Sequence, residues 1–354
     1  MDSSGDDLPV SGGPALSFGF NLGRIAGAGE DSDPVLRDGR ELGLVAVFDG
    51  MGGAGGTVYE TPDGPRTGAY LASRVARDVV EQRLVALLDP DWNLDGAATA
   101  ADLRRSLRTA LQERLAELRA PASGLRSRLL RALPTTIAVA ALQRRERDGR
   151  QWSCHLFWAG DSRVYAFEPG GGACQLTRDD IRDSGDAMAN LREDSVVSNA
   201  VSADTDFVVH HRRTELTAPF LVMAATDGCF GYVPSPMHFE HLVLASLRDS
   251  HDTDGWSAAV QARIGAVTGD DASMAVLGIG ADHDTFRALF APRTAELERR
   301  WITPLDGLDA DVREQERKLE ELREARRKRR AQLWAAYKPG YERHLAPPTT
   351  EGTP

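Results

Sequence analysis

The sequence predicts an α+β fold of stacked β-sheets flanked by helices. Apolar runs recur along the chain without polar alternation, which is typical of strands covered on both faces. Helical patterns come in pairs between the runs, which favours stacked sheets over strict β-α-β alternation. The runs comprise residues 42–48, 135–142, 154–159 with a continuation at 163–167, 220–225 and 273–279.

The first helical pair lies between the first two runs, at residues 67–88 and 102–119. In the second of these helices, leucines recur at three- to four-residue spacing and mark one apolar face. They are Leu107, Leu111, Leu115 and Leu118. Another pair, at residues 237–248 and 256–268, separates the last two runs. We expect both pairs to cover a sheet.

Length and composition indicate one large domain with appendages. The 354 residues are 42% hydrophobic and 27% charged, as in ordinary globular proteins. A formal net charge of −11 argues against nucleic acid as a partner. The three cysteines form no close pair, which argues against a disulfide framework and a thiolate zinc site and favours a reducing, cytoplasmic setting. Neither a signal peptide nor a membrane-spanning run is recognisable.

Changes in composition divide the chain into segments. Residues 1–16 are polar and Gly-rich and predict a flexible leader, and the main domain is expected at 17–282. Within it, residues 178–206 form a long polar excursion, and loops of this length are uncommon unless they are functional or disordered. Residues 293–345 predict a charged helical tail, either a solvated helix with intrahelical ion pairs or a partner-docking or coiled-coil arm.

Aspartates stand at the ends of four apolar runs. Asp49, Asp161 and Asp227 follow a run, and Asp270 precedes the last one. One such residue usually marks a turn, but four are expected to converge at one sheet edge, where cations must offset their repulsion. Magnesium or manganese prefers oxygen ligands, so Asp49 can bridge two ions beside the Gly50 carbonyl.

Two further details refine this prediction. Consecutive strand residues point to opposite faces, so Asp270 is the expected ligand and Asp271 caps or turns the chain. A phosphate-binding P-loop is the competing interpretation of the glycines after Asp49, but Thr57 and Val58 stand where that motif has Lys and Ser or Thr. The eight histidines are not arranged as ligands.

Together these motifs resemble the metal-dependent protein serine/threonine phosphatases of type 2C, the PPM family, in bacterial form. The resemblance covers residues 18–280, and its motifs keep the family's order. It implies a four-layer α/β/β/α sandwich with two central antiparallel β-sheets, to which the charged tail is appended. The matching motifs are Asp-Gly-x-Gly-Gly from Asp49, Thr-Thr at Thr135, Gly-Asp-Ser-Arg around Asp161, Thr-Asp-Gly around Asp227 and the acid pair from Asp270.

The family's early motif is only partly kept. Residues 23–31 align with it without a gap and retain Glu30 and Asp31, acids that lie near the metals in the family. Ala26 occupies the position of the family's phosphate-binding arginine. Arg24, two residues earlier and on the same side of an extended segment, is the candidate replacement for binding the substrate phosphate.

The resemblance implies two Mn²⁺ or Mg²⁺ ions and a hydroxide that bridges them and attacks phosphorus. Asp49, Asp227 and Asp270 are the implied catalytic residues. The implied metal ligands are Glu30 or Asp31, Asp49, the Gly50 carbonyl, Asp227, Asp270 and, around a weaker third ion, Asp161.

The function implied is hydrolysis of phosphoserine or phosphothreonine in a phosphoprotein, opposing a bacterial Ser/Thr kinase in signal transduction. One alternative is a metal-binding regulatory module in which Ala26 leaves turnover weak. Another is a phosphatase of a non-protein phosphoester. Neither nucleic acid nor a membrane is an expected partner.

Overall fold

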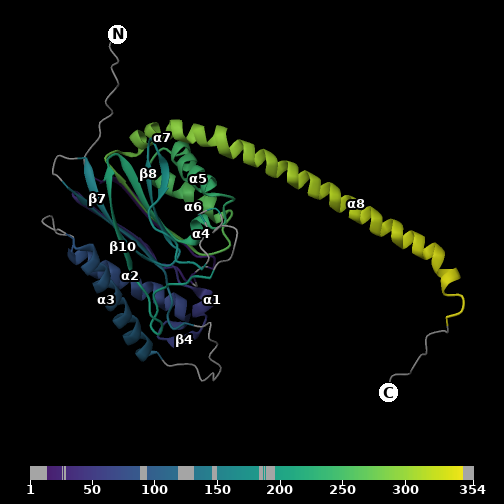
Figure 1. The fold of residues 1–354 in the computed structure, drawn as a ribbon, viewed down its shortest axis with the longest axis horizontal. Helices are drawn as coiled ribbons and strands as arrows, with labels where there is room; N and C mark the ends of the chain where they lie inside the picture. Colours follow the sequence, from purple (N-terminus) through teal and green to yellow (C-terminus); the bar gives the residue numbers. More distant parts are fainter. Residues whose placement is uncertain are drawn as a thin grey trace, which may run out of the picture. The chain divides into compact units, whose positions relative to one another are not determined.

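Figure 1 shows the fold of the chain in a computed structural model. The structure describes residues 14–25, 27, 29–87, 94–118, 131–145, 150–182, 186, 188 and 196–345. The chain divides into two compact units, Met1–Leu297 and Glu298–Pro354. Residues 1–13 of the predicted leader lie outside the described ranges, whereas residues 14–16 begin the first strand, β1 (Pro14–Leu22).

Two five-stranded antiparallel sheets form the centre of the first unit. One sheet has the strand order β1-β12-β11-β8-β9 and the other β10-β7-β6-β3-β2. The first adds β8 (Arg163–Glu168), β9 (Gly172–Gln175), β11 (Phe220–Ala225) and β12 (Ala272–Ile279) to β1. The second contains β2 (Val35–Gly39), β3 (Leu42–Val47), β6 (Ile137–Arg144), β7 (Gln151–Ala159) and β10 (His210–Thr217).

Strand β3 shows why the apolar runs do not alternate. Leu44 and Ala46 belong to the core cluster shared with the helices on one face of the sheet. Val45 and Val47 belong to the cluster between the two sheets. All four side chains are fully buried, because both faces of the strand are covered.

Helices cover the outer face of each sheet (Figure 1). On one side, Val80 and Leu103 pack into the cluster that contains Leu44. On the other, Phe18 of β1 packs edge-on against Trp256, with ring centroids 4.9 Å apart. This arrangement confirms the predicted α/β/β/α sandwich. The helices are α2 (Gly68–Leu87) and α3 (Gly96–Glu117) on the first side, and α5 (Pro236–Asp249), α6 (Thr253–Gly265) and α7 (His283–Leu297) on the second.

Short and polar elements are the ones that the sequence patterns do not predict. Residues 58–67 form a hairpin of β4 (Val58–Thr61) and β5 (Gly64–Thr67). Strand β10 is an edge strand with a largely exposed, charged sequence, so it lacks an apolar pattern. Single helical turns, α1 (Gly52–Gly55) and α4 (Asp227–Phe230), follow two of the strand ends.

The predicted tail boundary at residue 293 falls inside α7, whose Thr294 and Leu297 are buried. The second unit begins with a π-helical turn, Glu298–Ile302, and continues as α8 (Thr303–Tyr341), in which no residue is buried. Among the described residues, no helix has the length and apolar character needed to cross a membrane.

Candidate active site

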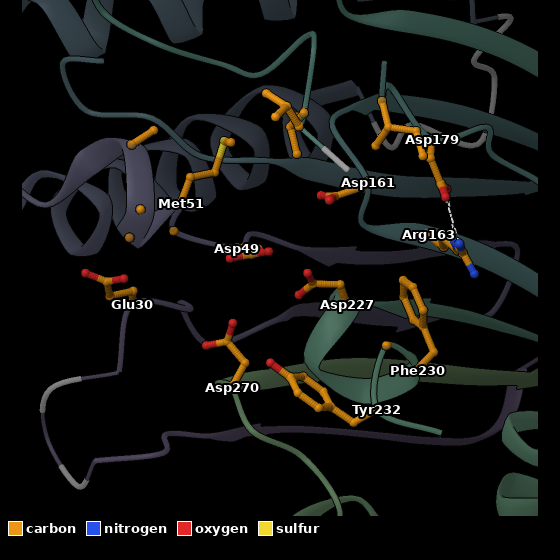
Figure 2. A pocket seen from close by; sticks show the side chains of 18 residues that line it. Glu30, Asp49, Met51, Asp161, Arg163, Asp179, Asp227, Phe230, Tyr232 and Asp270 are labelled. Atoms are coloured by element: carbon orange, nitrogen blue, oxygen red, sulfur yellow. Dashed lines mark hydrogen bonds and ion pairs between the residues drawn. The ribbon is translucent and has the colours of Figure 1, made fainter. Parts of the chain in front are cut away.

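Acidic side chains from distant parts of the chain surround one cavity of about 640 Å³ in the first unit (Figure 2). It contains six of the predicted site residues, namely Glu30, Asp49, Gly50, Asp161, Asp227 and Asp270. Asp179 adds a sixth acid to the described lining, whose one basic residue is Arg163. An excess of carboxylates over cationic groups makes this a cavity suited to positive ions.

The four aspartates come from two sheets, and the expectation of a single sheet edge is wrong. Asp49 and Asp161 follow β3 and β7 in one sheet, whereas Asp227 follows β11 and Asp270 precedes β12 in the other. The two sheets stack, so strand ends from both meet at the same cavity. Apolar runs reveal that strands are buried but not which strands share a sheet.

Two threonines hold the turn that carries Asp49. The Asp49 carbonyl accepts hydrogen bonds from the Thr135 hydroxyl at 2.6 Å and from the Thr136 backbone N–H at 2.8 Å. The Thr136 hydroxyl also lies 2.6 Å from that of Ser162, which is adjacent to Asp161. The Thr-Thr motif therefore couples the backbone positions of the first two aspartates.

Gly160 permits the tight turn that aims Asp161 into the cavity. Its φ of 108° lies in a region that favours glycine, and a Cβ there would come within 2.6 Å of the Thr136 side chain. A residue with a side chain at position 160 would therefore push the two turns apart.

Glu30 is fixed at the cavity by its neighbours. Its carboxylate accepts a 2.6 Å hydrogen bond from the Thr67 hydroxyl, and its backbone N–H donates to the Asp271 carboxylate. Asp271 also accepts from the Arg24 backbone N–H at 2.7 Å. Asp270 lines the cavity, whereas Asp271 ties down the loop after β1.

Asp31 is buried and does not belong to the described lining of the cavity. It is 1% exposed and accepts a 2.9 Å hydrogen bond from the Thr226 hydroxyl. Burial, with the charge of Asp227 nearby, raises the pKa of Asp31 to about 8. Between the two acids that the sequence leaves open as ligands, Glu30 therefore faces the cavity and Asp31 supports it.

Burial also perturbs the aspartates of the lining. It raises the pKa of Asp161 to about 8 and that of Asp227 to about 6, and neighbouring carboxylates add to both shifts. Burial and the charges of the surrounding aspartates raise the pKa of Asp49 well above its usual range. Protons or cations must therefore offset the mutual repulsion of these groups at neutral pH.

Arg163 supplies the positive charge in the lining. Its guanidinium donates two hydrogen bonds to Asp179, at 2.9 and 2.7 Å, and stacks over the Phe230 ring at 4.2 Å. Both partners of this ion pair are 3% exposed. The sequence motif contains Arg163 but offers no sign of Asp179 as its partner, because the ion pair joins the first residue of β8 to the segment after β9.

Asp180 fastens the beginning of the predicted excursion to the rest of the fold. Its carboxylate accepts from the Gly160 backbone N–H at 3.1 Å and from the Asn199 amide at 2.6 Å, and it lies 2.9 Å from the His210 ring. Apolar residues of this excursion, Ile181, Val196 and Val197, form part of the cavity lining. Residues 183–185, 187 and 189–195 of the excursion lie outside the described ranges.

The proposed phosphate-binding residue is not in the lining. The Arg24 side chain is exposed, and the residue is absent from the described cavity wall. Ala26, which occupies the family arginine's position, lies outside the described residues. The role of Arg24 therefore stays a prediction.

The donor set fits hard divalent cations because it consists of carboxylates and the Gly50 carbonyl. Among the described residues, no three acidic, histidine or cysteine side chains already form a compact ligand group. The acids instead face one another across a wider space (Figure 2). An arrangement this open suits more than one ion and bound water better than one closed cage.

Solved structures of phosphatases share this fold. The serine/threonine phosphatase PstP/Ppp of Mycobacterium tuberculosis matches with a TM-score of 0.50 and 17% identity, over 75% of this chain and 99% of that one. A bacterial serine phosphatase matches with a TM-score of 0.53 and 14% identity, over 76% and 99%. No family model and no curated protein matches the sequence. The chain thus has the fold of bacterial serine/threonine phosphatases, as its motifs predict.

Proposed function

We propose that this chain is a metal-dependent phosphatase that hydrolyses phosphoserine and phosphothreonine in proteins. The observation that carries the proposal is the convergence of Asp49, Asp161, Asp227 and Asp270 on one cavity. The fold shared with bacterial serine/threonine phosphatases supports it. The substrate would be a phosphoprotein made by a bacterial Ser/Thr kinase, so the enzyme would reverse a signalling modification.

The relative positions of the acids in the cavity suit different roles in metal binding. Asp49 lies between Glu30 and Asp227 in Figure 2, so it would bridge two divalent cations. Glu30 and the Gly50 carbonyl would complete one side of the site and Asp227 with Asp270 the other. Asp161, adjacent to Asp227, would hold a third ion. When bound, such cations acidify water and neutralise phosphate charge, which is the chemistry that phosphoester hydrolysis requires.

The residues of the chain also shape substrate binding. A phosphate dianion would be repelled by the ionised carboxylates of this lining, so we expect substrate affinity to depend on the cations. Arg163 partly offsets the charge of Asp161 and Asp227. Ile181, Val197 and the rest of the apolar wall would contact the peptide beside the phosphorylated residue.

The first prediction concerns Asp49. Asp49→Asn should lower Mn²⁺-dependent hydrolysis of a phosphopeptide on the order of a thousandfold, because it removes the bridging charge. Calorimetry should show about two Mn²⁺ bound per native chain and weaker binding in the variant. Asp63→Asn, which changes an exposed acid in the β4–β5 turn, is the matched control and should retain activity.

A specific observation supports a second candidate function. The one arginine of the described lining is already paired with Asp179, which leaves no second cationic side chain there for a phosphate. A regulatory module that binds metal but turns over poorly is consistent with this. It would bind Mn²⁺ yet show phosphopeptide hydrolysis equal to that of Asp49→Asn. Efficient hydrolysis of p-nitrophenyl phosphate without hydrolysis of phosphopeptides would instead favour a non-protein phosphoester.

A further inference from the structure

Helix α8 carries an apolar stripe with a seven-residue period. Five side chains of this stripe are between 47% and 68% exposed, and no residue of the helix is buried. They are Leu308, Val312, Leu319, Leu322 and Leu333. Leu305, Val312, Leu319 and Leu333 occupy the first core position of the repeat, and Leu308, Leu322 and Ala336 occupy the second, three residues later. Such a pattern is the seam along which two helices form a coiled coil.

Polar residues interrupt this seam in an uneven way. Gln315 stands at a core position in the first part of the helix, and Arg326 and Arg329 stand at core positions in the second. Arginines in a seam disfavour any arrangement that brings them against their own copies. The positions of Arg326 and Arg329 therefore limit whether two copies of α8 can pair in parallel or in antiparallel direction.

The two halves of α8 carry opposite charge. Residues 303–322 contain seven acidic and three basic side chains, whereas residues 323–341 contain one acidic and seven basic ones. Five ion pairs within the helix satisfy part of this charge, including Lys318–Glu314 and Lys328–Glu324. A helix divided in this way is complementary to a second copy of itself in the reverse direction.

We propose that α8 forms an antiparallel coiled coil with a second copy of this chain, centred between Glu320 and Glu321. In this register Leu319 meets Leu322 of the second copy, and Leu308 meets its Leu333. The remaining core layers pair Leu305 with Ala336, Gln315 with Arg326 and Val312 with Arg329. No arginine of the seam then faces another arginine.

The positions that flank the seam support the same register. Asp309 lies opposite Arg330 of the second copy, and Glu316 lies opposite its Arg323. Symmetry repeats each pair, so four oppositely charged pairs border the interface. Among the described residues, Asp309, Glu316 and Arg330 have no ion pair within the helix, which leaves them available for these contacts.

A parallel pairing has the opposite electrostatics. It would place Arg326 against Arg326 and Arg329 against Arg329 in the core. At its flanks, Glu316 would face Asp311 and Lys318 would face Arg323. The charges of α8 therefore favour antiparallel over parallel pairing. A substitution that reverses the charge of residue 316 should weaken an antiparallel dimer and strengthen a parallel one.

Sedimentation equilibrium of the 354-residue chain tests this proposal. The measured mass should approach twice the chain mass of 38.4 kDa. Glu316→Arg and Arg323→Glu should each raise the dimer dissociation constant about tenfold, because two symmetric attractive pairs become repulsive. The double variant Glu316→Arg with Arg323→Glu should restore the native dissociation constant. Circular dichroism should show unchanged helix content in every variant.

Glu321→Arg makes the same charge change outside the seam and should leave the dissociation constant within about twofold of the native value. A native chain that stays monomeric at tens of micromolar would overturn the proposal. A tighter dimer in Glu316→Arg would also overturn it and indicate parallel pairing. A dimer that none of the seam variants weakens would show that another surface joins the two copies.

Discussion

Residue 52 determines how closely Glu30 can approach the cavity. The Glu30 carboxylate occupies the space where a Cβ of residue 52 would lie, so only glycine leaves that space free. The obstructing atoms are the far end of a flexible side chain, so a substitution would displace Glu30 rather than unfold the turn. Gly53, one residue on, has open space at the equivalent point.

Gly52→Ala should therefore weaken Mn²⁺ binding by about tenfold to a hundredfold while changing the free energy of unfolding by less than about 1 kcal/mol. Gly53→Ala is the matched control and should leave Mn²⁺ affinity unchanged. Calorimetric titration and chemical denaturation measure the two quantities. Equal Mn²⁺ affinities in the two variants would exclude Glu30 as a metal ligand.

At the scale of elements, helix α2 positions the loop that carries Glu30 and Asp31. Arg74 of this helix donates hydrogen bonds to the carbonyls of Gly29, Glu30 and Asp31 at 3.0 to 3.1 Å. Its guanidinium also stacks 3.4 Å from the Tyr70 ring centroid. One side chain therefore fixes three successive peptide groups beside the cavity.

Arg74→Met should cost about 2–3 kcal/mol of unfolding free energy, because it leaves partly buried carbonyls without their donor. It should also lower Mn²⁺ affinity by at least about tenfold, since the loop is no longer held in place. Arg83→Met, at an exposed position of the same helix, should change stability by less than about 0.5 kcal/mol. Loss of stability without loss of Mn²⁺ affinity would limit Arg74 to a structural role.

At the scale of the whole molecule, the acidic cavity links stability to pH and to cations. The pKa values of Asp31 and Asp161 rise from 3.8 to about 8, and that of Asp227 rises to about 6. The folded state therefore binds more protons than the unfolded state over this range. The resulting stability is fully present below pH 3.8 and is lost as pH rises through 6 and 8.

We expect the melting temperature of the cation-free protein to fall as pH rises from about 5 to 8. Mn²⁺ should raise it more at pH 8 than at pH 6, because at lower pH the cations compete with protons. Differential scanning calorimetry in EDTA and in Mn²⁺ measures both effects. Asp161→Asn should flatten the pH dependence, and a native melting temperature independent of both pH and Mn²⁺ would contradict the linkage.

The sequence by itself predicted the buried strands and five of the six acids that line the cavity. Runs such as Leu42–Phe48 predict strands because both of their faces are apolar, and the Asp-Gly motifs predict turns at their ends. The sequence also predicted different roles for Asp270 and Asp271, although β12 begins only at Ala272. These features are local, so the order of residues is sufficient to reveal them.

Only the tertiary structure decided how these pieces meet. The aspartates converge because two stacked sheets present their strand ends to one cavity. Arg163, at the start of β8, pairs with Asp179, which lies after β9. The choice of Glu30 over Asp31 for the lining depends on contacts with Thr67 and Thr226. Such contacts join residues far apart in the chain, and no spacing or periodicity in the sequence specifies them.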